Sequence, residues 1–356
     1  MSAVLAGRRP RGRIVLRPRG TSLSLRMDVR LLVVCAGLAS LGALAFALEL
    51  AWGEFPLPLG DVLATLAGGG HQADRFIVID VRLPRALVAA LAGAALAVSG
   101  AVFQILVRNP LASPDIIGIT GGASVAAVTV FVLGASTALV PVAAFGGALA
   151  ASALLYALAW RGGLSPYRLV LVGIGIEALG TAGTTYALIR GRIEDVHQAA
   201  VWLLGSLNAR AFSDVWPLVV GLAILAPAIA LLARSLDALA LGEDQARALG
   251  VRVEPARLGL VVAAAGLAAI AVAATGPVVF VAFIAPHIAR ALTRTSGAAV
   301  LPAAALCGAL LVLVSDLVGR LLLSPTEIPV GIVTSVVGAP FFLWLLYRAN
   351  RTMVIE

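Results

Sequence analysis

Residues 258–289 read LGLVVAAAGLAAIAVAATGPVVFVAFIAPHIA, a run that contains no acidic residue and no arginine. A helix rises about 1.5 Å per residue, so roughly 20 residues are enough to cross the hydrocarbon layer of a membrane. This run is too long for one crossing, and Gly276-Pro277 inside it is a strong helix breaker. The stretch therefore predicts two successive membrane-spanning helices.

The remainder of the chain follows the same pattern. Of its 356 residues, 61% are apolar and 12% are charged, whereas soluble domains have about 45–50% apolar and about 25% charged residues. Further apolar runs predict eight more spans, at 31–48, 86–107, 116–160 (a pair, broken near 134–141), 169–189, 215–233, 298–315 and 328–347. We expect an all-α integral membrane protein whose ten transmembrane helices occupy residues 31–348.

The distribution of arginine predicts the orientation. Every one of the 26 basic residues is arginine, and nineteen of them fall at one face of the expected bundle. The other seven are Arg75, Arg82, Arg85, Arg190, Arg192, Arg210 and Arg320. Because positive charge accumulates in cytoplasmic loops, both termini are expected to be cytoplasmic. Residues 1–30, with eight arginines, are expected to form a disordered cytoplasmic leader, and residues 349–356 a cytoplasmic tail.

Several classes of site are absent from the sequence. A Walker A loop requires a lysine, and the chain has none, so it cannot hold that ATPase site. Its three histidines are dispersed, and both cysteines fall inside expected helices, so no metal site and no catalytic cluster is expected. The net charge of +8 is explained by membrane topology and anionic lipid headgroups, so no nucleic acid is expected as a partner.

Three polar-rich stretches interrupt the helices in order. They are VRLPR at 81–85 with RNPLASPD at 108–115, then LGEDQARALG at 241–250, and finally GPVVF at 276–280 with APHIAR at 285–290, SDL at 315–317 and EIPVGIVT at 327–334. In order and spacing, from about Leu31 to Tyr347, the chain resembles the FecCD-type permeases of type II ABC importers, which serve ferric siderophores, haem and cobalamin.

The resemblance implies a BtuC-like permease fold in the cytoplasmic membrane and transport by alternating access. It also implies a second permease (a sister chain or a second copy), ABC ATPase subunits that hold ATP and Mg, and an external substrate-binding lipoprotein. The permease itself would be no enzyme and would carry no cofactor. The motifs most similar to permeases for ferric catecholates such as enterobactin are Trp202 with GSLN at 205–208, SPD at 113–115 and APHIAR at 285–290. Haem or cobalamin is the alternative cargo.

The resemblance also assigns two contact sites. The ATPase is expected to dock on the cytoplasmic segment 234–257, through a short helix that includes Leu241, Gly242, Glu243, Asp244, Ala246, Arg247, Leu249 and Gly250. Ala246, Leu249 and Val251 would supply its apolar contact. At the outer helix ends, Arg82, Arg85 and Arg320 are expected to be exposed and to receive acidic side chains of the binding protein.

The translocation pathway is assigned from the residues themselves. Glu177 is the one acid deep within an expected span, and Thr181 and Thr184 share its helical face. That face either lines the pathway or places Glu177 in an internal hydrogen bond. Arg190 and Arg192, together with Arg210, either guide an anionic cargo at the outer mouth or mark the membrane boundary.

Two other classes of protein are compatible with the helices alone. A secondary transporter should show paired broken helices and coupled intramembrane carboxylates, and Glu177 alone fits that poorly. A purely structural membrane protein would leave the charged loop around Glu243 without a role.

Overall fold

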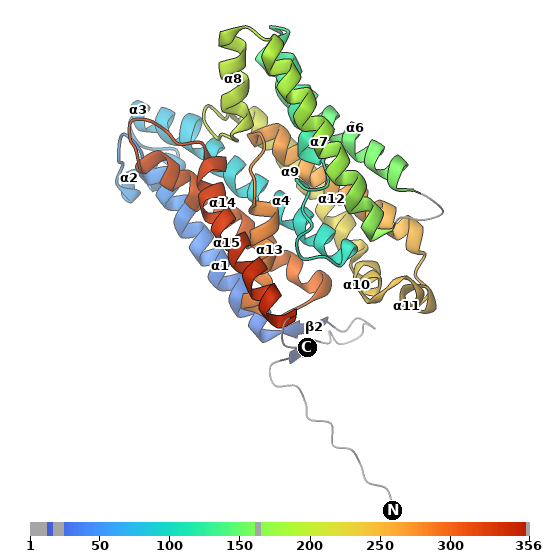
Figure 1. The fold of residues 1–356 in the computed structure, drawn as a ribbon. Coiled ribbons are helices and arrows are strands. Elements are labelled where there is room, and N and C mark those ends of the chain that lie inside the picture. The colour runs from blue at the N-terminus through green and yellow to red at the C-terminus, as the bar shows by residue number, and fades with distance from the viewer. Residues whose placement is uncertain (1–12, 17–24, 161–164, 354–356) are drawn as a thin grey trace, which may run out of the picture.

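The computed structural model describes residues 13–16, 25–160 and 165–353, which are almost entirely helical (Figure 1). The long helices are α1 (Val29–Ala51), α4 (Leu83–Val107), α6 (Val140–Ala159), α7 (Pro166–Arg190), α9 (Phe212–Leu231), α12 (Val253–Thr275), α14 (Leu301–Leu321) and α15 (Val330–Met353). Shorter ones are α2 (Leu59–Leu66), α3 (Gln72–Arg75), the π-helix η1 (Phe76–Arg82), α5 (Ile119–Val132), the 3-10 helix η2 (Thr137–Leu139), α8 (Ile193–Leu203), α10 (Ala233–Leu241), α11 (Glu243–Ala248), α13 (Val281–Thr293) and the 3-10 helix η3 (Gly297–Val300). The all-α prediction is confirmed.

Each of the ten expected spans corresponds to one helix. In the described part of the chain, eight helices are long and apolar enough to cross a membrane. The other two, α5 and α13, are apolar but have only 14 and 13 residues. Their shortness follows from the irregular segments that precede them, residues 108–118 and 276–280. The chain is a multi-pass membrane protein, and the count of ten crossings stays a prediction.

The centre of the bundle is formed by α4 and α12, which are mostly buried by their neighbours. Small residues make this possible, because they allow helix backbones to approach closely without large side chains between them. A Cβ atom added at Gly100 on α4 would overlap the Ala282 carbonyl on α13, and one added at Gly93 would overlap the Gly308 carbonyl on α14. The glycines of α4 therefore set its distance from two neighbouring helices.

The break at Gly276-Pro277 lies where three chain segments meet. Gly276 has φ +72° and ends α12, and α13 begins only after Phe280. The freed Thr275 carbonyl accepts a 2.8 Å hydrogen bond from the Ser206 amide, just beyond α8. The Gly331 amide at the start of α15 donates to the Gly205 carbonyl at 3.2 Å. Non-helical backbone inside a membrane bundle is tolerated where protein satisfies its polar groups, as these bonds do.

The expected leader is not irregular throughout. Strands β1 (Arg13–Leu16) and β2 (Leu25–Asp28) pair antiparallel, with Arg13 opposite Asp28 and Leu16 opposite Leu25. The β-branched pair Ile14-Val15 favours a strand there. The rest of residues 1–24 lies outside the described residues, as do the last three residues of the expected tail.

Close packing at Gly100 gives a direct test of this architecture. Gly100→Leu should lower the free energy of unfolding by about 3 kcal/mol, because the added side chain must displace backbone of α13. Gly37→Leu on α1 is the matched control, since nothing lies within 4 Å of a Cβ atom there. Thermal unfolding of the purified chain in detergent measures both. Equal loss for the two variants would contradict the packing described.

Candidate functional site: outer ion cluster, coupling segment and cavity

Buried ion pairs join the outer ends of three helices. Arg85 on α4 contacts Asp316 on α14 through two parallel bonds of 2.8 and 2.9 Å, and its Nη1 reaches Glu327 at 2.9 Å. Arg320, one turn after Asp316, lies 3.7 Å from the same carboxylate and pairs with Glu49 on α1. Such two-pronged arginine–carboxylate contacts are both strong and geometrically specific. The cluster therefore fixes α1, α4 and α14 relative to one another.

Arg82 contacts backbone carbonyl groups, whereas Arg85 and Arg320 contact carboxylates. Its guanidinium donates to the carbonyl oxygens of Leu50 at 2.8 Å, Ala51 at 3.0 Å and Phe55 at 2.6 Å. These acceptors lie at and just beyond the last turn of α1, where carbonyl groups lack helical partners and a cation is favourable. Arg82 thus caps α1 from the side of α4.

The expectation that Arg82, Arg85 and Arg320 are exposed is wrong. Their side chains are turned inward, and those of Arg85 and Arg320 are only 9% and 8% exposed. All three touch one small pocket of about 190 Å³, into which Glu327 also projects an oxygen-bearing side chain. The physical reason is that buried partners hold each arginine: Asp316 and Glu49 pair with Arg85 and Arg320, and the carbonyl groups at the end of α1 accept from Arg82. Their role in docking a binding protein stays a prediction.

The burial and pairing of two of these acids were not predicted from the sequence. Glu49 and Asp316 are buried, yet the expected spans 31–48 and 298–315 each ended one residue before them. A search for uncharged runs necessarily stops at the first charge. The available signal was the spacing of Asp316 and Arg320, which places an acid and a base on one face of a helix.

Residues 234–257, expected to contact the ATPase, contain the expected short helix. Gly242, with φ +126°, separates α10 from α11. On α11, Glu243 accepts a 2.6 Å hydrogen bond from the buried Arg257 of α12, and Arg247 contacts Glu243 at 3.3 Å and Asp244 at 3.4 Å. The segment is therefore held against the membrane helices by an ion pair that is partly shielded from water.

The assignment of apolar contacts in this segment needs a correction. Ala246 is completely buried within the chain, so it cannot meet a partner. Leu241 and Leu249 are instead exposed, together with Asp244 and Arg247. We name these four residues the cytoplasmic face. An amphipathic pattern does not reveal whether a small apolar residue packs against its own chain or against another.

Glu177 is engaged in an internal hydrogen bond. Its carboxylate accepts the Gly121 amide at 2.9 Å, in the first turn of α5, where a negative charge is favourable. Nearby Asp115 lies in the loop before α5. The pKa of Asp115 is raised to about 7, chiefly by burial and also by the Glu177 carboxylate, while a hydrogen bond with Thr120 opposes the rise. This geometry matches the internal-bond alternative, and a pathway role for Glu177 stays a prediction.

The remaining residues expected along the pathway are not brought together. Thr181 is exposed on α7, whereas Thr184 is buried. Arg190 lies over the Tyr186 ring at 5.4 Å, and Arg192 is 3.9 Å from Glu194 with both side chains largely in solvent. These two arginines occupy the turn between α7 and α8.

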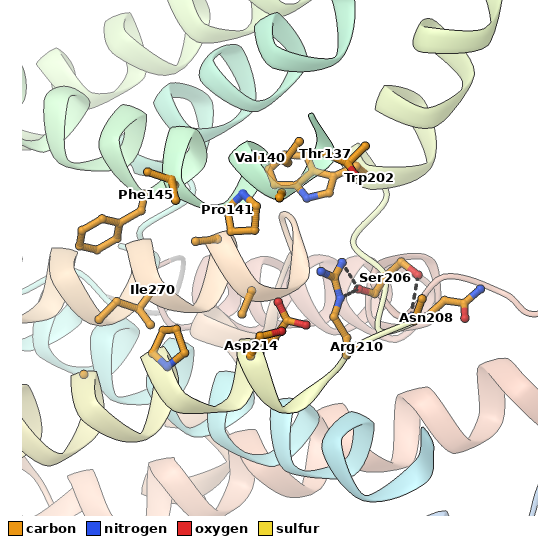
Figure 2. Close-up of a pocket in the computed structure, with 18 of the residues that line it drawn as sticks. Thr137, Val140, Pro141, Phe145, Trp202, Ser206, Asn208, Arg210, Asp214 and Ile270 are labelled. Atoms are coloured by element: carbon orange, nitrogen blue, oxygen red, sulfur yellow. Dashed lines mark hydrogen bonds between the residues drawn. The ribbon is translucent and has the colours of Figure 1, made fainter. Parts of the chain in front are cut away.

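Arg210 instead borders a large cavity of about 1210 Å³ between α6, α8, α9 and α12. Its Nε and Nη2 donate to the Ser206 carbonyl at 3.3 and 3.1 Å. Burial lowers the pKa of Arg210, and nearby Asp214 counteracts this. Figure 2 shows Arg210 and Asp214 pointing into the cavity from one end, with Trp202 above them and Phe145 and Ile270 at the other end. None of the five other expected pathway residues is among the described residues lining it.

A family model described as the FecCD transport family matches residues 41–348. The chain belongs to this family. It is similar to the probable siderophore transport system permease protein YfhA of Bacillus subtilis, with 40% identity covering 90% of this chain and 96% of that protein. It is also 40% identical to the ferric enterobactin transport system permease protein FepG of Escherichia coli, and the match covers 90% of this chain and 98% of that protein.

A solved structure described as an inward-facing conformation of a putative metal-chelate type ABC transporter has the same fold. Its TM-score is 0.79 and its identity 29%, over 89% of this chain and 99% of that one. This FecCD-family chain is therefore a multi-pass permease subunit of the cytoplasmic membrane. ATP hydrolysis belongs to a separate subunit of such transporters, so the permease is not itself an enzyme.

The outer ion cluster gives a stability prediction for this family member. Asp316→Asn should lower the free energy of unfolding by about 3 kcal/mol, because Arg85 and Arg320 would keep a buried charge without its carboxylate. Glu327→Gln is the matched control, since the Glu327 side chain is 35% exposed and its loss should cost less than about 1 kcal/mol. Thermal unfolding of both variants measures these losses of stability. A larger loss for Glu327→Gln than for Asp316→Asn would contradict the greater importance of the buried carboxylate.

Proposed function

We propose that this permease carries a ferric siderophore inward across the cytoplasmic membrane, with a ferric catecholate such as ferric enterobactin as the favoured cargo. The observation that supports this most is the similarity to the enterobactin permease at 40% identity over nearly its whole length. The cargo arrives already chelated, so the permease needs only to change which side its pathway faces. Haem or cobalamin is the alternative cargo.

The partner ATPase would dock on the cytoplasmic face. There the exposed Leu241 and Leu249 supply apolar contact, and Asp244 and Arg247 supply charge. The Glu243–Arg257 ion pair links α11 to α12, so a displacement of α11 would be transmitted to this central helix. ATP and Mg would be bound by that ATPase and not by this chain.

At the outer side, an external binding lipoprotein would dock over the ion cluster. Glu327 is the most accessible acid there, and it holds Nη1 of Arg85. An acidic side chain of the binding protein would compete with Glu327 for that guanidinium. Because the arginines are partly neutralised already, such contacts would orient the partner more than strengthen binding. A second permease, a sister chain or a second copy, would complete the transmembrane unit.

Uptake measurements test the cargo. Cells lacking this gene should lose uptake of labelled ferric catecholate, regain it on complementation, and retain uptake of cobalamin. Neutralising the exposed Arg190 and Arg192 together should slow an anionic ferric catecholate more than a neutral chelate, because positive potential at a pathway mouth concentrates anions. Restoration of cobalamin uptake with no siderophore uptake would overturn the cargo assignment.

A substitution at the cytoplasmic face tests ATPase docking. Leu249→Asp should reduce copurification of the ATPase about tenfold and abolish uptake, because it places a charge in an apolar contact. Leu133→Asp is the control, since Leu133 is also exposed but follows the far end of α5, and it should copurify the ATPase as the parent does. Undiminished copurification with Leu249→Asp would show that the ATPase docks elsewhere.

A further inference from the structure

The large cavity lies toward one end of the helix bundle. It is bounded by the first turns of α6, by the first two-thirds of α9 and by the last turns of α12. Helices α6 and α9 start at the end of the bundle where α12 finishes. In the orientation predicted by the arginines this is the outer side. All three helices are among those able to cross a membrane. The cavity is therefore a recess in the spanning region, level with the outer half of the bilayer.

Polar and apolar groups are separated along the cavity. Ser206, Arg210 and Asp214 lie near the start of α9, while Ile270 lies toward the other end of the cavity (Figure 2). Ile224 and Leu225, further along α9, also line the cavity. Trp202 stands at the polar end, and tryptophan is enriched at the headgroup level of membranes. The lining of the cavity is therefore complementary to an amphiphilic molecule, because it is polar at one end and apolar along the rest.

We propose that this cavity binds one phospholipid of the outer leaflet. An acyl chain fills the apolar part, and a zwitterionic phosphoethanolamine headgroup lies at the polar end. A guanidinium has five N–H donors, so Arg210, oriented by the Ser206 carbonyl, has donors left for a phosphate. Asp214 supplies the opposite charge for the ammonium group.

The pair of opposite charges discriminates between possible occupants. An anionic ferric chelate would meet the Asp214 carboxylate and a long apolar wall, whereas a zwitterionic lipid satisfies both charges and the wall. Water is a poor occupant of the deeper part, because apolar cavities of this kind stay dry. At this depth of a bilayer the surrounding molecules are lipids, and their acyl chains are as apolar as the leucine side chain that lines the cavity.

Native mass spectrometry of the full transporter, extracted in detergent with added phosphatidylethanolamine, tests the proposal. The parent should retain one such lipid per chain. Arg210→Gln should weaken retention about tenfold, because a charge-assisted bond to phosphate is lost. Ile224→Trp, at a position 62% exposed, should fill the recess and displace the lipid, and Val220→Trp serves if that variant is not recovered.

Leu231→Trp is the control, because Leu231 lies on the same helix, is exposed and does not line the cavity. It should retain lipid as the parent does. The proposal is overturned if Arg210→Gln and the tryptophan variants retain as much lipid as the control. It is also overturned if Ile224→Cys, with Cys35 and Cys307 replaced by alanine, forms a disulfide with a second permease chain. The readout is lipid retention, so it is independent of the cargo.

Discussion

The fold of this permease depends on a carboxylate that water does not reach. Asp316 is 1% exposed and is shared by Arg85 from α4 and Arg320 from its own helix. An isolated charge in such a place would be very costly, so each member of the cluster requires the others. Through Glu49 the cluster includes α1, and through Glu327 it includes the loop that leads into α15. The outer ends of three helices and the loop before α15 are thereby held by interacting charges, while the helix interiors pack through alanine and glycine.

The cytoplasmic side is organised by a different set of contacts. Asp237 on α10 accepts the Ala298 amide of η3 at 2.6 Å, and Glu243 on α11 pairs with Arg257 on α12. A force applied to α10 and α11 therefore reaches both the central helix α12 and the start of α14. Since α14 also carries Asp316 and Arg320, one helix connects the cytoplasmic contacts to the outer ion cluster.

Much of this architecture follows from the sequence. The break at Gly276-Pro277 is predicted because neither residue suits a helix interior, and it is where α12 ends. Charge networks were harder to predict, since the uncharged runs ended at residues 48 and 315, next to Glu49 and Asp316. The inward orientation of Arg82 depends on the end of α1 lying beside it, which a linear pattern does not show. The burial of Ala246 likewise depends on tertiary packing.

The central claim is that Arg85 and Asp316 act as one internal unit at the outer ends of the helices. A double-mutant cycle on the free energy of unfolding, with Arg85→Gln, Asp316→Asn and the double variant, tests it most directly. If the two side chains hold each other, each single variant leaves a buried charge without its nearest partner, and the double variant removes both charges. We expect an interaction energy of about 2 kcal/mol between the two side chains. If the losses of stability of the two single variants add up to that of the double variant, within about 0.5 kcal/mol, the two side chains do not act as a unit.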